Sequence, residues 1–190
     1  GPQPVTVALD AFDAALWDVA WLPASVDRSR IDPVHAAVSQ RSIGDLGMAL
    51  KSLPPGRIAA ADLHRAGVTN PTHLRDARAW AWQFKEDPAA AAGGLVTPRD
   101  PGALRAALAA VAPVNARIQG VVRALSVVAD VLDGRLGPAA AVVQNDANRG
   151  PVLRLRWREE IHPRWIGTGG VIHLDATMPE DIVRVFLPGL

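Results

Sequence analysis

The chain has 190 residues, 49% of them hydrophobic, and a formal net charge of +1, which excludes a disordered tail and a strong global attraction to nucleic acid or membranes. It contains no cysteine, which excludes disulfides and thiolate-bound metal clusters and fits a cytoplasmic protein. No apolar run approaches the roughly 20 residues that span a bilayer, so we expect no membrane partner.

The first part of the chain predicts a series of amphipathic helices. Apolar residues recur at three- and four-residue steps over 5–21, which is the helical period. A second, short helix is expected to begin after Asp32-Pro33, because Asp caps helices and Pro suits their first turn. Further helices are expected over 43–53, 57–66 and 72–85, the last of them capped by Asn70.

The middle of the chain predicts a loop followed by its strongest helix. Residues 87–101 are rich in alanine, glycine and proline, which is typical of a loop or linker. Helices are then expected over 102–112 and 114–133. In the second of these, Ile118, Val122 and others form one continuous apolar stripe that should be buried.

Beyond Pro138 the hydrophobic period changes from about 3.6 to 2, which indicates strands. Strands over 139–144 and 152–158 flank a turn rich in Asn, Asp and Gly, and therefore predict a β-hairpin. A third strand over 171–174 and a closing helix over 179–186 predict a βα unit.

Together these elements predict a mainly α fold. A helical bundle over 3–137, with the loop or linker inside it, is expected to precede a small α/β segment over 138–190. That terminal segment should hold the β-hairpin and the βα unit.

The second hairpin strand carries a candidate nucleic-acid site. Strict alternation predicts that Arg154, Arg156 and Arg158 share one strand face, where neighbours lie roughly 6.6–7 Å apart, about the spacing of successive phosphates. Arg164 extends this basic stripe, and Trp165 beside it suits stacking on a base. The alternative is a solvated face partly paired with neighbouring glutamates, with the tryptophan as a hydrophobic anchor.

Residues 58–78 have the outline of a helix-turn-helix with a glycine in the turn. In a DNA reader, Thr72, His73 and Arg75 at the start of the second helix would face the bases. Any helical bundle also produces this outline. The five histidines lack metal-site spacing, and the chain contains no phosphate-binding loop or nucleophile motif, so we expect no metal, cofactor or catalytic residue.

The order of elements near the C-terminal end supports a family resemblance. A hairpin strand over 153–156 is followed by a linker and then by an apolar strand that ends in Asp175-Ala176-Thr177. This order resembles superfamily-2 helicases, in which a strand ending in such a tripeptide couples nucleotide hydrolysis to nucleic-acid binding. The likeness covers 152–190 and is greatest to the branch related to DNA-repair and damage-inducible helicases, where a helical insertion precedes that strand.

The resemblance implies that Asp175 and Thr177 belong to the coupling motif and that the helical region is an arch or clamp beside the nucleic acid. Because the chain lacks the family's phosphate loop, acidic box and cluster cysteines, it implies an accessory fragment that is not catalytic alone. Its expected partners are DNA or RNA and the remainder of a helicase-like protein. Lysine occurs only at Lys51 and Lys85, which indicates a bacterial or mobile-element source.

A second hypothesis is a helical protein–protein interaction module. Its natural platform is the long helix expected over 114–133, whose apolar groove would receive a partner segment. Binding of single-stranded DNA that weakens steeply with salt favours the first hypothesis. Salt-insensitive binding to a protein favours the second.

Overall fold

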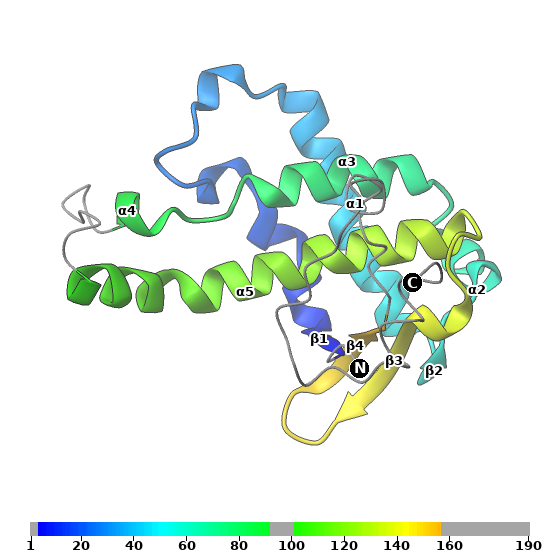
Figure 1. Cartoon of the computed structure of the whole chain (residues 1–190). Helices are drawn as coiled ribbons and strands as arrows, with labels where there is room; N and C mark the ends of the chain where they lie inside the picture. The colour runs from blue at the N-terminus through cyan, green and yellow to red at the C-terminus, as the bar shows by residue number, and fades with distance from the viewer. Residues whose placement is uncertain (1–3, 92–100, 157–190) are drawn as a thin grey trace, which may run out of the picture. The chain divides into compact units, whose positions relative to one another are not determined.

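The computed structural model describes residues 4–91 and 101–156, and in this part of the chain the fold is mainly α, as predicted (Figure 1). Its longest helices are α1, α3 and α5, and α3 packs along α5. The bounds of the α-helices are α1 Pro33–Ser52, α2 Ala60–Arg65, α3 Pro71–Trp82, α4 Pro88–Ala91 and α5 Pro101–Leu132.

A four-stranded antiparallel sheet completes the described fold, with the strand order β1-β4-β3-β2. The predicted hairpin is confirmed as β3 and β4, preceded by a short 3-10 turn, η5 (Pro138–Ala140). The two outer strands come from regions that were predicted to be helical. The strand bounds are β1 Val5–Ala8, β2 Gly56–Arg57, β3 Ala141–Asp146 and β4 Gly150–Leu155.

The prediction of an N-terminal helix over 5–21 is wrong. After β1 the chain forms three separate 3-10 turns, because Asp13 and Asp18 each cap a new turn by accepting a hydrogen bond from a backbone N–H two residues later. The apolar residues of this segment still enter the core. The turns are η1 Leu9–Phe12, η2 Ala14–Trp17 and η3 Val19–Trp21, and η4 (Arg28–Arg30) follows them.

Helix α1 begins where predicted, since the Asp32 carboxylate accepts a hydrogen bond from the backbone N–H of Val34. It then runs without a break through the two expected helices. Gly44 and Gly47 lie against η2 and η1 so closely that a Cβ at Gly47 would be 2.6 Å from the Phe12 Cβ. The chain segments therefore approach to backbone distance.

The helix predicted over 57–66 is shorter than expected. Its first residues form β2 and pair with β3, and α2 begins only at Ala60. Gly67 ends this helix with a positive φ of 89°, which glycine adopts without strain. Helix α3 begins as predicted, because the Asn70 side chain accepts hydrogen bonds from two backbone N–H groups of its first turn.

The two helices predicted over 102–112 and 114–133 are one helix, α5, which continues through Pro113. The buried stripe is confirmed: Ile118 and Leu125 are at most 1% exposed. Gly134 ends α5 with a φ of 71°. The expected loop over 87–101 begins with the short helix α4, and residues 92–100 lie outside the described part.

The core lies between α5 and its neighbours. One face of the sheet, carrying Val7, Leu153 and Leu155, is buried in the same cluster as the stripe of α5. Gly120 lets α5 approach β1, because a Cβ there would lie 3.2 Å from a methyl carbon of Val7. The hairpin therefore packs into the same hydrophobic core as the helices.

Several predicted features lie outside the described residues. They are the third strand over 171–174, the closing helix over 179–186, and the site residues Arg158, Arg164, Trp165, Asp175 and Thr177.

Candidate nucleic-acid interface

The sheet has a second face, opposite the one that carries Leu153 and Leu155, and it holds the basic residues. Directly opposed residues of antiparallel strands point to the same side, so the strand register defines this face. We call it the outer sheet face. It consists of Thr6, Ala8, Arg57, Val142, Gln144, Val152 and Arg154.

Two arginines lie in one row across this face. Arg154 on β4 is opposite Val142 on β3, and Val142 is in turn opposite Arg57 on β2. Because adjacent strands lie about 4.8 Å apart, the backbones at the two arginines are separated by roughly 9.6 Å. On the other side of Arg154, Thr6 of β1 continues the row with a hydroxyl group.

Arg154 lies in the most enclosed part of the outer sheet face. Its side chain is half-buried, and its Nε is buried without a hydrogen-bond partner among the described residues. Val152, its neighbour on the same face, is fully buried. A buried guanidinium N–H without an acceptor is unfavourable by about 1–3 kcal/mol, so this donor favours an anionic or carbonyl partner.

Arg156 follows the end of β4 and is exposed. Its backbone N–H donates a hydrogen bond of 2.7 Å to the carbonyl of Ala140, which extends the hairpin pairing by one residue. The structure therefore brings Arg154 and Arg156 to the same end of the sheet. That all three arginines of the predicted stripe share one face stays a prediction, because Arg158 is not described.

Sequence reasoning missed Arg57, which was assigned to a helix. Strand β2 has only two residues, so no alternation marks it. The available signal was Pro54-Pro55-Gly56, which opposes a helix start and leaves an extended segment before Ala60. The pairing of β2 with β3 continues one residue further, because the Ile58 N–H donates a hydrogen bond of 3.0 Å to the carbonyl of Ala141.

The helix-turn-helix outline corresponds to α2 and α3. The residues that were predicted to face DNA bases differ in whether they are exposed. Thr72 and His73 are exposed, whereas Arg75 binds Asp130 of α5 at 3.1 Å and also Asp133 just after it. Hydrogen bonds to Asp133 and Asp130 raise the pKa of Arg75 above its ordinary value. Arg75 therefore ties α3 to the end of α5 and does not extend toward a ligand.

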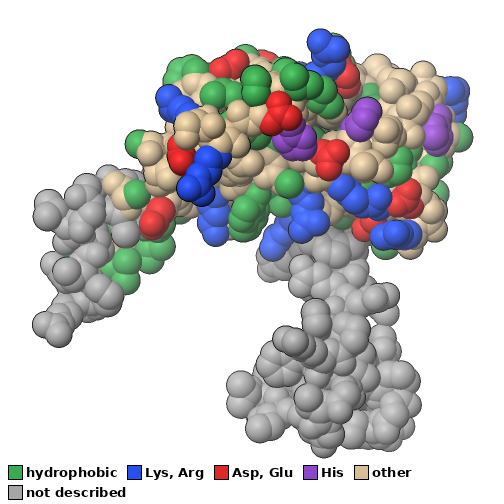
Figure 2. Space-filling model, turned by 90° about the horizontal axis from the view of Figure 1, so that it is seen from above, with side chains coloured by type: hydrophobic (Ala, Val, Ile, Leu, Met, Phe, Trp, Pro, Cys, Tyr) green, Lys and Arg blue, Asp and Glu red, His purple; other side chains and the backbone are tan. Residues whose placement is uncertain are grey.

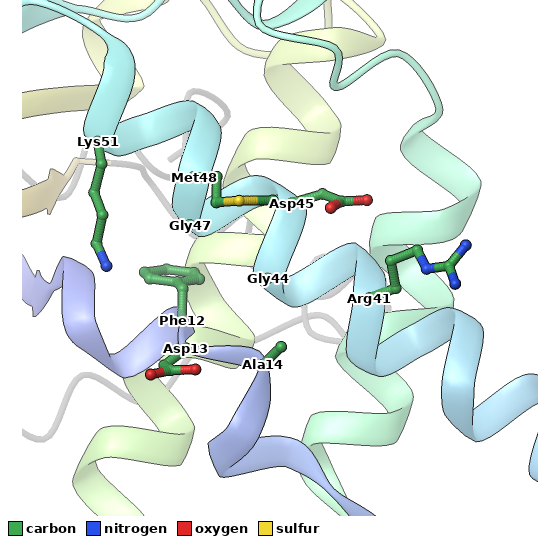
Figure 3. A pocket seen from close by; sticks show the side chains of 9 residues that line it. All are labelled: Phe12, Asp13, Ala14, Arg41, Gly44, Asp45, Gly47, Met48 and Lys51. Carbon is green, nitrogen blue, oxygen red and sulfur yellow. The ribbon is translucent and has the colours of Figure 1, made fainter.

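A groove of about 320 Å³ lies between α1 and the first 3-10 turns (Figure 3). In Figure 3, Lys51 extends from α1 toward the segment that carries Phe12 and Asp13, whereas Arg41 and Asp45 extend to the other side. Charges of both signs line the groove, and it contains no histidine or cysteine. Its lining residues are Phe12, Asp13, Ala14, Arg41, Gly44, Asp45, Gly47, Met48 and Lys51.

The described residues show no sign of a metal centre, since no group of three or more His, Cys, Asp or Glu side chains lies close enough to hold an ion. None of the described helices is both long and apolar enough to cross a membrane. Figure 2 shows acidic, basic and hydrophobic side chains interspersed over one face of the molecule. Basic character is therefore local, as the near-zero net charge requires.

Comparison with known proteins matches the chain to no protein-family model, no curated protein and no solved structure.

Proposed function

We propose that this chain is an accessory, nucleic-acid-facing part of a cytoplasmic helicase-like protein of bacterial or mobile-element origin, and that its outer sheet face contacts the phosphate backbone. The observation that carries the proposal is the sheet register, which sets Arg57 and Arg154 in one row with Arg156 just beyond the strand end. Arginine suits this role because its planar guanidinium donates two parallel hydrogen bonds to one phosphate.

The three arginines differ in burial, so we expect them to contribute differently to phosphate binding. Arg57 and Arg156 are exposed and available to a ligand, whereas Arg154 keeps a buried N–H that has no acceptor among the described residues. A phosphate that reaches Arg154 gains a donor that water does not satisfy, so this contact is worth more than an ordinary surface pair. The exposed arginines contribute mainly through counterion release, which depends on salt.

The position of the site in the chain agrees with the helicase resemblance. The likeness begins in β4, the strand that carries Arg154, and the Asp-Ala-Thr tripeptide follows it in sequence. With no phosphate loop in the chain, its part is to hold nucleic acid while hydrolysis takes place elsewhere in the larger protein. We infer no catalysis by this chain alone.

The test is the triple variant Arg57→Ala, Arg154→Ala, Arg156→Ala, studied by fluorescence anisotropy with single-stranded and duplex DNA over a range of salt. Affinity should fall about equally for all sequences. The slope of log K against log salt should decrease by about 0.9 per lost contact on duplex DNA and about 0.7 on single strands.

A matched control removes three exposed arginines that lie off the sheet, Arg30, Arg65 and Arg78. It changes the net charge by the same amount and should leave both affinity and slope close to the wild type. The proposal fails if the control weakens binding as much as the sheet variant does, or if the wild type binds neither DNA at low salt.

An interaction module remains a second candidate, at a different place from the one predicted. The stripe over 114–133 is not available to a partner, because it is buried against the rest of the fold. Instead, large apolar side chains are exposed elsewhere: Trp21 is 70% exposed, Val34 69% and Met48 65%. This candidate predicts an association that persists at high salt and that the sheet triple variant does not affect.

A further inference from the structure

The outer face of α1 carries a regular pattern that the sheet site does not explain. Six of its exposed positions are separated by four, three, four, three and four residues, which is the spacing of the contact positions in a coiled coil. The apolar members are well exposed, at 69% for Val34, 43% for Val38 and 65% for Met48. We call this row the α1 seam; it consists of Val34, Val38, Arg41, Asp45, Met48 and Ser52.

The residues of the α1 seam lie in pairs at equal distances on either side of the level of Ile43. Arg41 and Asp45 are equally distant from that level on opposite sides, and so are Val38 and Met48. When a helix of this kind lies antiparallel to its own copy, each seam residue therefore faces its symmetric counterpart. Arg41 meets Asp45 and Val38 meets Met48, whereas at the two ends of the seam Val34 meets Ser52.

From this self-complementarity we infer that the α1 seam is the interface of a two-fold symmetric dimer with a second copy of the chain. Arg41 of each copy pairs with Asp45 of the other, so the interface holds two equivalent ion pairs. Outside them, Val38 of each copy packs on Met48 of the other, and these contacts exclude water from the charged centre.

The charges select both the partner and the direction. Within the described part of the chain neither Arg41 nor Asp45 takes part in an ion pair, so both are available to a second copy. A parallel arrangement would place Arg41 against Arg41 and Asp45 against Asp45, which is repulsive. The antiparallel arrangement also places the a positions of one helix opposite the d positions of the other, as in antiparallel coiled coils.

The neighbouring groove leaves room for the second helix. Arg41, Asp45 and Met48 of the α1 seam also line the groove of about 320 Å³ beside α1, and Phe12 contributes to its other side (Figure 3). Gly44 and Gly47 also line the groove and pack closely against Ala14 and Phe12 on its other side. Because Met48 lines the groove as well, a side chain from the second copy can enter beside it.

The expected dimer is weak. Helix α1 has 20 residues and is thus about 30 Å long, so contact along one side buries less than the roughly 800 Å² per partner of a standard stable interface. Association should therefore depend on concentration over the range of about 1 μM to 1 mM. This inference does not rest on nucleic-acid binding, because it uses another element and other residues.

Charge reversal tests the pairing. Sedimentation equilibrium of the full chain should show that R41D and D45R each weaken association at least about tenfold, because each homodimer then contains two like-charge contacts. An equimolar mixture of the two variants should associate like the wild type, since every charge again faces its opposite. The double variant R41D/D45R should also associate like the wild type, because each charge at the interface again faces an opposite one. The control R78D, on the exposed face of α3, should behave as the wild type.

Cross-linking tests the direction and register. The chain has no cysteine, so V38C and M48C each introduce a single thiol. A mixture of V38C and M48C should form an interchain disulfide in a glutathione buffer. V38C alone should not, because its thiols would lie about 15 Å apart along the axis.

Circular dichroism of each variant should show the helical content of the wild type, so that a loss of association can be distinguished from a loss of structure. The proposal is overturned if the wild type is monomeric at about 1 mM, if single charge reversals leave association unchanged, or if the mixture of R41D and D45R stays monomeric. Cross-linking of V38C to itself as fast as to M48C would also overturn it.

Discussion

At the scale of single residues, two buried tryptophans connect the N-terminal turns to the helices. The indole N–H of Trp17 donates to the Ala11 carbonyl at 3.0 Å, and that of Trp80 donates to the Trp17 carbonyl at 3.1 Å. Both rings meet Phe84 edge-on, with centroids 5.3 Å apart. The irregular N-terminal segment is therefore held by hydrogen bonds that a helix or sheet would otherwise supply.

This arrangement predicts a loss of stability in Trp80→Phe. The smaller ring leaves the Trp17 carbonyl buried without its donor, which should lower the free energy of unfolding by about 1–3 kcal/mol in urea denaturation. Trp82→Phe is the matched control on the same helix. Trp82 is 47% exposed and forms a cation–π contact with Lys85, so this substitution should lower the free energy of unfolding by less than about 1 kcal/mol. Equal effects of the two substitutions would contradict this role of Trp80.

Close backbone approach predicts that Gly47→Ala is destabilising. The added methyl would lie 2.6 Å from the Phe12 Cβ and 3.2 Å from its carbonyl oxygen, neither of which can move without shifting η1. Such overpacking should lower the free energy of unfolding by about 1–3 kcal/mol. Gly137→Ala is the control, because nothing lies within 4 Å of its added methyl and its φ is −77°. A neutral or stabilising Gly47→Ala would show that η1 is not fixed against α1.

At the scale of elements, α5 organises the described fold. It continues through Pro113 although proline removes a backbone donor and opposes a helix interior. Packing compensates: just after the proline, the Asn115 amide accepts from the Glu86 N–H and donates to the Glu86 carbonyl, both at 2.9 Å. The segment after α3 is thereby attached to α5 at the place where the helix is locally weakest.

The buried stripe of α5 predicts a large effect of Leu125→Ala. Leu125 is 0% exposed, so truncation leaves a cavity and should lower the free energy of unfolding by roughly 2–5 kcal/mol. Leu108→Ala on the same helix is the control. Leu108 is 48% exposed, and its truncation should cost less than about 1 kcal/mol. A loss well under 1 kcal/mol for Leu125→Ala in chemical denaturation would show that the stripe is not core.

At the scale of the whole described unit, the sheet joins distant parts of the chain. Strand β1 from the N-terminal end pairs with β4, and β2 from between the helices pairs with β3. This arrangement creates the outer sheet face, which no single segment carries. The proposed nucleic-acid site and the proposed dimer seam therefore lie on different elements, and substitution of one leaves the other intact for testing.

The sequence by itself determined the features that local physics controls. Asp32-Pro33 and Asn70-Pro71 specify helix starts, because capping involves only a few neighbouring residues. Alternation around a polar turn specifies the hairpin, and the helical period specifies the buried stripe of α5.

Only the tertiary structure decided the features that depend on distant partners. Residues 5–21 carry a helical period, but pairing of β1 with β4 and capping by aspartates replace the helix. Two predicted helices join across Pro113 because packing outweighs local propensity. For the candidate site, alternation indicated Arg154, whereas Arg57 joins it only through the register of β2 on β3. Register between segments far apart in sequence is set by the whole core, so no local pattern contains it.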